Sequence, residues 1–171
     1  FHRSCIEPWL QAKKQCPVCK TSYGTLTGNQ PPGKMKGRLP LCDCNTVRVY
    51  KEPLLEGFDD CGAIEVSFSF HGGIQGPEHQ NPGLPYPGTT RTGYLPDNEE
   101  GRKILAKFKT AWERKLMFTI GTSITRGVDN LIVWNGIHVK TETCGGAASY
   151  GYPDETYFAR VSDELAQKGI L

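Results

Sequence analysis

Four potential metal ligands crowd the start of the sequence, and they constrain the folding of that segment more than any other feature of the chain. His2 and Cys5 form one closely spaced pair, and Cys16 and Cys19 form another. Such pairs suit tetrahedral zinc, because each short turn presents two donors to one ion. Pro17 stiffens the second turn. On spacing alone the four donors close one zinc site; the alternative is ordinary buried thiols and a surface histidine.

The cysteine count points to a reducing compartment. The chain of 171 residues has seven cysteines, whereas a short secreted protein held by disulfides usually has an even number. We therefore expect metal ligands and free thiols, and a location in the cytoplasm or the nucleus. Cys42 and Cys44 could form a further metal site with Cys61, but Cys61 and Cys144 are expected to be unligated.

The overall composition is that of a globular domain. Hydrophobic residues make up 37% and charged residues 22%, and 20 basic against 18 acidic side chains leave a net charge of +2. This balance argues against a nucleic-acid backbone as the main partner. No apolar run is long enough to cross a bilayer and no secretory signal opens the chain, so we expect no membrane partner. Since Phe1 stands where a methionine would begin a protein, we expect a longer parent chain.

Periodicity predicts an α+β fold, an antiparallel sheet with helices packed on it. Residues 46–50 (TVRVY) and 64–70 (IEVSFSF) alternate apolar and polar side chains, as half-buried strands do. Residues 117–120 and 131–134 are expected to form two more strands, separated by the polar turn 121–130.

Three segments have the pattern of helices. The first covers residues 6–13, and the second begins after Asp97, a good N-cap residue followed by two glutamates in the first turn. The third begins near residues 153–154 and ends at Gly169. The second and third helices each have an apolar face, made by Ile104, Leu105, Phe108, Ala111, Trp112 and Leu116, and by Tyr157, Phe158, Val161 and Leu165.

Glycine and proline mark two segments in which we expect little helix or strand. Residues 23–37 are predicted to be a connector, and residues 72–97 a long loop of which only parts pack down. His71 and His79, on glycine-rich stretches, are expected at the surface.

Two known families share motifs with this chain. The order Phe-His-x-x-Cys, Trp-Leu and Cys-Pro-x-Cys near the start is similar to the second half of a RING finger. The remainder resembles the Deltex family of ubiquitin ligases, in motifs that follow one another through the chain: residues 28–31, 33–35, 73–79, 81–83, 86–91, 94–97, 118–123, 133–138 and 151–154. The form YPGTTR at 86–91 is similar to the shorter, Deltex-3-like branch.

The resemblance implies a division into three parts. These are the C-terminal part of a RING finger (1–22), a linker (23–37) and a Deltex C-terminal domain (38–171). In RING fingers the ligand pairs interleave, so His2 and Cys5 would bind one zinc ion, and Cys16 and Cys19 a second. The remaining donors would come from upstream residues, so this chain alone is expected to be weak or inactive as a ligase.

The RING resemblance also implies a partner, a ubiquitin-charged E2. Ile6, Trp9 and Pro17 fall where the family contacts E2, although plain helix packing is an equal alternative for Trp9. A RING acts by holding the E2 thioester in a reactive pose.

The Deltex resemblance implies that the domain binds ADP-ribose, and that it promotes ubiquitin transfer to protein lysines or to a ribose hydroxyl of ADP-ribosylated proteins or nucleic-acid ends. Ser123 and His138 match ADP-ribose-binding positions, and His138 with Glu164 matches the pair that promotes transfer. A ribose hydroxyl is a poor nucleophile, so a positioned base helps it, and histidine titrates near neutral pH. Notch-pathway partners are implied by the family name alone.

Further residues suit a nucleotide pocket. Gly121 and Thr122 supply backbone N–H groups and a hydroxyl without bulk. Tyr150 and Tyr152 could stack on adenine, and Arg91 could face the diphosphate. Core packing is the preferred interpretation for Trp134.

The chain departs from the family pattern at two positions. Tyr150 stands where many members have a histidine, which preserves stacking but removes a protonation-dependent contact. Val139 stands where a second histidine commonly follows the catalytic one. Two other functions stay open: a non-catalytic ADP-ribose reader, and a lysine-directed ligase whose C-terminal domain docks substrates.

Overall fold

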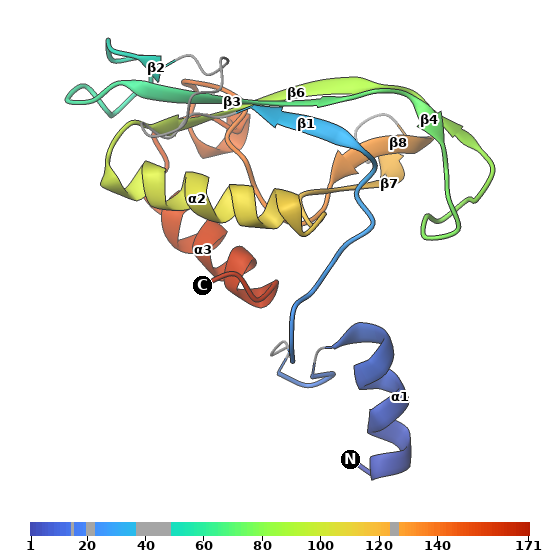
Figure 1. Cartoon of the computed structure of the whole chain (residues 1–171). Coiled ribbons are helices and arrows are strands. Elements are labelled where there is room, and N and C mark those ends of the chain that lie inside the picture. The colour runs from blue at the N-terminus through green and yellow to red at the C-terminus, as the bar shows by residue number, and fades with distance from the viewer. Residues whose placement is uncertain (15, 20–22, 37–48, 124–126) are drawn as a thin grey trace.

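The computed structural model describes residues 1–14, 16–19, 23–36, 49–123 and 127–171. Its elements are α1 (Arg3–Lys13), β1 (Gly33–Lys36), β2 (Val49–Tyr50), β3 (Ala63–Phe70), β4 (Gly73–Ile74), β5 (Pro85–Tyr86), β6 (Thr89–Pro96), α2 (Glu99–Glu113), β7 (Phe118–Ser123), β8 (Val128–Trp134), the 3-10 turn η1 (Ala147–Ser149) and α3 (Tyr157–Gln167). In Figure 1, α2 runs under one face of the main sheet and α3 lies below α2. No described helix has the length and apolar character that a membrane span requires.

Strand β3 is the centre of the main sheet. It pairs with β6 along its whole length, from Ala63 opposite Pro96 to Phe70 opposite Thr89. On its other side, β1 pairs with one end and β2 with the other, and all pairings are antiparallel. Strands β7 and β8 form a separate antiparallel pair, as do β4 and β5. The predicted α+β fold with an antiparallel sheet and packed helices is therefore confirmed.

The core lies between the sheet and α2. Alternate residues of β3 are buried while those between them are half-buried, as period-two patterning requires. Helix α2 covers this face with the residues that its periodicity singled out. The buried residues of the two elements are Ala63, Ile64, Val66, Phe68 and Phe70, and Gly101, Ile104, Leu105, Phe108 and Ala111.

An aromatic cluster closes the end of the core next to β7 and β8. Phe118 stacks on Trp134 with ring centroids 4.3 Å apart, and Phe68 meets both rings edge to face. Trp134 is half-buried and packs against the core, and it anchors the strand pair to the main sheet.

The helix ends correct two sequence predictions. The N-cap of α2 is Asn98, whose side chain accepts a hydrogen bond from the Gly101 N–H at 2.9 Å. Asp97 pairs instead with Arg102. Helix α3 begins at Tyr157 rather than near 153–154, because the Asp154 side chain accepts from Thr156 in a turn that precedes the helix.

The end of α3 follows the prediction. Gly169 has φ 71°, and the N–H groups of Gly169 and Ile170 return to the carbonyls of Ala166 and Leu165. This is the Schellman arrangement, in which a glycine takes the left-handed conformation just past the helix.

The two segments expected to lack regular structure both contain strands. Residues 33–36 of the predicted connector form β1, and the predicted loop 72–97 contains β4, β5 and the eight-residue β6. β-Branched threonines at 89, 90 and 92 favour a strand, but the neighbouring glycines and prolines concealed this signal. Of the strand predicted at 46–50, Val49 and Tyr50 are in β2 and the remainder lies outside the described residues, as do Cys42 and Cys44.

Residues 28–30 are fixed to the domain before β1 begins. The Gly28 N–H donates to Arg114 O at 2.8 Å, and the buried Gln30 side chain accepts from the Phe118 N–H at 3.1 Å. Asn29 accepts a hydrogen bond from the Thr119 hydroxyl at 2.9 Å. The connector is thus pinned to the end of α2 and to the start of β7.

His79 holds the loop between β4 and β5 and is not a surface residue as expected. Only 8% of it is exposed. Its Nδ1 accepts from the Gly76 N–H at 3.0 Å, so Nε2 carries the proton and donates to Asn29 O at 2.8 Å. A histidine with both ring nitrogens occupied ties this loop to the connector.

Candidate functional site

A cavity of about 520 Å³ opens where β6, β7 and β8 meet the segment that follows β8. Its volume is within the range of small-molecule sites. Five candidate ligand residues line it: Arg91, Thr122, Ser123, His138 and Tyr150. Apolar walls come from Ile132, Val133, Trp134, Ile137 and Val139. Polar groups converging on an apolar cavity are the usual form of a binding site.

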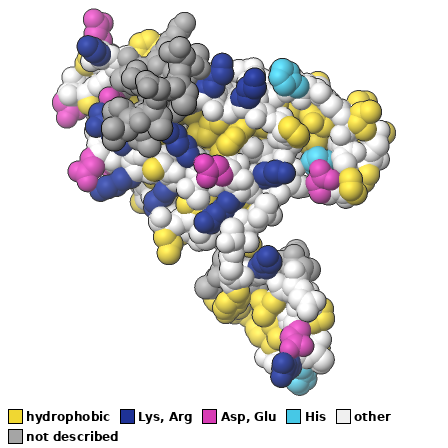
Figure 2. All heavy atoms as spheres, in the orientation of Figure 1, with side chains coloured by type: hydrophobic (Ala, Val, Ile, Leu, Met, Phe, Trp, Pro, Cys, Tyr) yellow, Lys and Arg dark blue, Asp and Glu magenta, His cyan; other side chains and the backbone are white. Residues whose placement is uncertain are grey.

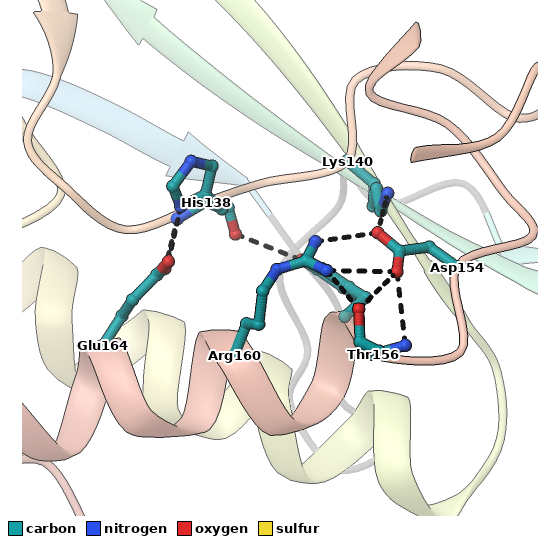
Figure 3. A network of polar contacts seen from close by, with 7 residues as sticks. His138, Lys140, Asp154, Thr156, Arg160 and Glu164 are labelled. Atoms are coloured by element: carbon teal, nitrogen blue, oxygen red, sulfur yellow. Dashed lines mark hydrogen bonds and ion pairs between the residues drawn. The ribbon is translucent and has the colours of Figure 1, made fainter. Parts of the chain in front are cut away.

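His138 and Glu164 meet, although they are 26 positions apart in the sequence. One carboxylate oxygen of Glu164 lies 2.5 Å from Nδ1 of His138, and the other accepts from the His138 backbone N–H at 2.8 Å. Helix α3 supplies the carboxylate, which Figure 3 shows pointing up to the histidine. The side chain of Glu164 is 19% exposed and that of His138 is 65% exposed, so the ring stands at the cavity with its inner edge held.

The contact with Glu164 defines the tautomer of His138. An ionised carboxylate only accepts hydrogen bonds, so the proton of the neutral ring must be on Nδ1. The other ring nitrogen, Nε2, then has a lone pair and points away from Glu164 (Figure 3). A base with one nitrogen held and the other open to a ligand is the arrangement that general-base chemistry requires.

A buried ionic network supports the segment that carries His138. Lys140 and Asp154 are each 4% exposed in their side chains, and their Nζ and Oδ2 atoms lie 2.6 Å apart. Arg160 of α3 reaches the same oxygen at 2.8 Å, and Thr156 bonds to the other oxygen (Figure 3). The hydrogen bond from Arg160, with those from Lys140 and Thr156, holds the pKa of Asp154 well below its usual range despite burial.

Two tyrosines complete this support. The Tyr157 hydroxyl donates to the His138 carbonyl at 3.2 Å, and the Lys140 ammonium lies over the Tyr157 and Tyr152 rings at 5.2 and 5.8 Å. His138 is therefore fixed through its ring, its N–H and its carbonyl, all from α3. Sequence reasoning named Tyr157 only as a core residue and did not find Lys140, whose isolated positive charge gives no local signal of burial.

Arg91 supplies positive charge to the cavity. Its guanidinium donates to the Thr89 hydroxyl at 2.7 Å and to the Thr90 carbonyl, both within β6. No carboxylate among the described residues pairs with Arg91. An arginine held by neutral groups keeps its full charge available to an anion.

Tyr150 stands at the rim of the cavity with 61% of its surface exposed. Its φ of 58° is unusual for a bulky residue, and its carbonyl accepts from the N–H groups of Thr141 and Glu142. Backbone contacts thus hold an exposed aromatic ring in a strained conformation, as is common at ligand sites.

Two of the residues predicted to bind ADP-ribose do not line the cavity. Gly121 is in β7 but outside the cavity lining. Tyr152 is fully buried, its hydroxyl donates to Tyr94 O at 3.0 Å, and its ring meets Phe58 edge to face. The prediction that Tyr152 stacks on adenine is therefore wrong, because the ring has no surface left for a ligand. Val139 packs over Gly93.

Comparison with known proteins identifies the family. The model of the Deltex C-terminal domain matches residues 27–170. The chain belongs to the Deltex C-terminal domain family. It is 48% identical to "Probable E3 ubiquitin-protein ligase DTX3" of Homo sapiens over 170 residues, which are 99% of this chain and 46% of that protein. It is 46% identical to "E3 ubiquitin-protein ligase DTX1" of Homo sapiens and to "E3 ubiquitin-protein ligase DTX4" of Mus musculus, over 91% of this chain and 24% of each. The chain thus spans about half of DTX3 and a quarter of the other two.

The part of the chain before the Deltex C-terminal match carries the predicted metal ligands. Cys5 and Cys19 are exposed and Cys16 is half-buried. No three or more His, Cys, Asp or Glu side chains of the described residues lie together as a metal site would need. The four donors therefore do not meet at one point, although a histidine and three thiols remain a donor set that suits zinc.

The predicted E2-contacting residues lie on and after α1. Trp9 is 37% exposed, and Ile6 and Pro17 are half-buried. Figure 2 shows hydrophobic side chains gathered on this part of the molecule, while acidic and basic side chains are interspersed over the Deltex domain.

Proposed function

We propose that this chain binds ADP-ribose in the cavity and forms the acceptor-handling part of a Deltex-type E3 ubiquitin ligase. In this role it promotes transfer of ubiquitin from a charged E2 to a ribose hydroxyl of an ADP-ribosylated protein or nucleic-acid end, or to a protein lysine. The names of the relatives support ligase membership. The observation that carries the finer proposal is the His138–Glu164 pair at the cavity.

The cavity offers what ADP-ribose needs. The diphosphate carries two negative charges, which the Arg91 guanidinium complements, since no carboxylate in the described part of the chain pairs with it. Ser123 places a hydroxyl group at the cavity, and the Thr122 oxygen, whose proton goes to Asp129, can accept a hydrogen bond from a ribose hydroxyl. The exposed Tyr150 ring offers a stacking face for adenine.

His138 acts as the general base in the proposed transfer. Its Nε2 takes the proton of the ribose hydroxyl while that oxygen attacks the carbonyl carbon of the E2–ubiquitin thioester. An ester bond forms, the carbon–sulfur bond breaks, and the E2 cysteine leaves as a thiolate that recovers a proton. Glu164 stabilises the imidazolium and keeps the ring in the required tautomer.

Delivery of the thioester belongs to the segment before the domain. Ile6, Trp9 and Pro17 would contact E2. His2 with Cys5 and Cys16 with Cys19 would each supply two donors to a zinc ion, which stabilises the fold of a RING. Such a protein works in the cytoplasm or the nucleus, where thiols stay reduced.

The test separates binding from transfer. ADP-ribose binding is measured by calorimetry, and transfer by the rate of ester formation in a protein with the complete RING and charged E2. Glu164→Gln should bind ADP-ribose within about threefold of wild type but transfer about 100-fold more slowly. The glutamine NH₂ donates to Nδ1 and forces the proton onto Nε2, which removes the base but preserves the shape.

Control variants give the other outcomes their meaning. Asp163→Asn, an exposed change next to Glu164 on α3, should leave binding and transfer unchanged. Equal transfer by wild type and Glu164→Gln would reduce the domain to a reader or docking module. A folded wild type that does not bind ADP-ribose would sink the proposal and leave lysine-directed transfer.

A further inference from the structure

The β7–β8 pair contains a bulge where β7 lines the cavity. Gly121 pairs with Leu131 and Ser123 pairs with Val128, so Asp129 and Asn130 together face the single residue Thr122. Bulges bend a strand, increase its twist and redirect its side chains, and they are frequent beside functional sites. Two of the cavity-lining residues, Thr122 and Ser123, lie at this bulge.

Asn130 gives the bulge its conformation. Its φ is 58°, in the left-handed region that Asn tolerates better than most residues. The Thr122 hydroxyl donates to the Asp129 carboxylate at 2.6 Å across the bulge. The backbone at residue 130 thus sets how the two strands meet at the cavity.

A clamp from the β4–β5 loop holds Asn130 in place. The Oδ1 atom of Asn130 accepts one hydrogen bond from Gln75 Nε2 at 2.7 Å and a second from Asn81 Nδ2 at 3.0 Å. Gln75 is 3% exposed, and its own Oε1 accepts from the Asn81 N–H at 3.1 Å. Both polar atoms of the Gln75 side chain are therefore hydrogen-bonded, which fixes the position of the clamp.

We propose that Asn130 is a positioning residue for the ligand cavity, and that the Gln75–Asn81 clamp holds it so that Thr122 and Ser123 face the ligand. The inference rests on the proposed binding of ADP-ribose. Without the bulge, the register beyond Gly121 shifts by one residue, and such a shift turns side chains to the opposite face of a strand. A protein that holds the bulge only part of the time binds more weakly in proportion to the lost fraction.

The test uses two substitutions at one position in the whole chain, with ADP-ribose as the probe. Both Asn130→Gly and Asn130→Ala remove the clamped side chain, but only glycine adopts a positive φ without penalty. We expect the dissociation constant for ADP-ribose to rise about two- to threefold in Asn130→Gly and about tenfold in Asn130→Ala. Rescue by glycine distinguishes positioning by the backbone from loss of a side-chain contact.

A third variant covers the case in which Asn130→Ala fails to fold. Asn81→Ala removes one of the two donors to Oδ1 and leaves the backbone at residue 130 unaltered. It should weaken binding about two- to threefold with a thermal midpoint close to that of wild type. Wild-type affinity in Asn81→Ala, or equal affinity in wild type, Asn130→Gly and folded Asn130→Ala, would overturn the inference. Absence of ADP-ribose binding by wild type would instead overturn the proposed function itself.

Discussion

At the scale of single residues, the segment that supports the candidate site is distinguished by buried charged side chains. Asp154 and Lys140 are almost fully enclosed, with Arg160 on the same carboxylate. Removing one member of such a group is costly because it leaves an uncompensated charge in a poorly solvated place. The network therefore fixes the segment that bears His138 to α3, through Arg160, which lies four residues before Glu164 on that helix.

Asp154→Asn should lower the free energy of unfolding at neutral pH by about 3–5 kcal/mol, since Lys140 stays buried without its carboxylate. Chemical denaturation of the variant beside Asp163→Asn checks this. The exposed control should lie within about 0.5 kcal/mol of wild type. A loss below about 1 kcal/mol in Asp154→Asn would show that the ion pair does not support the fold.

The depressed pKa of Asp154 also predicts how stability depends on pH. The unfolded chain takes up this proton near pH 4, whereas the folded protein resists it to lower pH. The stabilisation is thus present above about pH 4 and is lost as pH falls from there through the folded pKa. Unfolding curves between pH 5 and pH 2 should show a shallower decline for Asp154→Asn than for wild type.

At the scale of elements, the connector and the β4–β5 loop show where reading the sequence was insufficient. Period-two and period-3.6 patterns predicted β3, β7, β8, α2 and α3, because one face of each is buried in the core. Strands β1 and β6 were not predicted, because the glycines and prolines next to them are typical of a loop. Gly28 does not mark a loop but a close contact: a Cβ at this position would lie 2.0 Å from Lys115 O, so only glycine fits.

Gly28→Ala should therefore destabilise the domain by about 1–3 kcal/mol, because the connector must move away from the end of α2. Gly121→Ala is the matched control, since its Cβ would make only an ordinary contact with Val133 at 3.5 Å. Thermal unfolding of the two variants should separate them, with the midpoint of Gly121→Ala at or above that of wild type. Similar midpoints for both would contradict the close docking of residue 28.

The candidate site was partly accessible from the sequence. Motif resemblance named His138, Glu164 and Ser123, and the positive charge of Arg91 suggested that residue. The fold brings His138 and Glu164 into contact from distant segments. Lys140, Gln75 and Asn130 gave no such signal, because their roles depend on burial and on a left-handed backbone that appear only after folding. The prediction for Tyr152 was wrong for the same reason, because the sequence does not distinguish an aromatic residue of the core from one that lines a cavity.

At the scale of the whole molecule, the core residues lie between Leu55 and Ile170, with Leu26 and Met35 packed against them. Removal of residues 1–23 should therefore leave the thermal midpoint within about 4 °C of wild type. Removal of residues 1–31 takes away Gln30 and its bond to Phe118, and should lower the midpoint by at least twice that amount. Equal midpoints for the two truncations would place residues 24–31 outside the folded unit.

The connector is also a tether of defined length. The Tyr23 N–H bonds to Lys14 O at the end of α1, and Leu26 packs on the core, so Gly24 and Thr25 alone separate the two anchor points. Three Cα–Cα steps span at most about 11 Å. Gly24 has open space around it and φ 95°, so this point permits rotation more readily than extension. A partner bound to α1 is thereby held at a high effective concentration around the Deltex domain. Each residue inserted after Gly24 would lower that effective concentration.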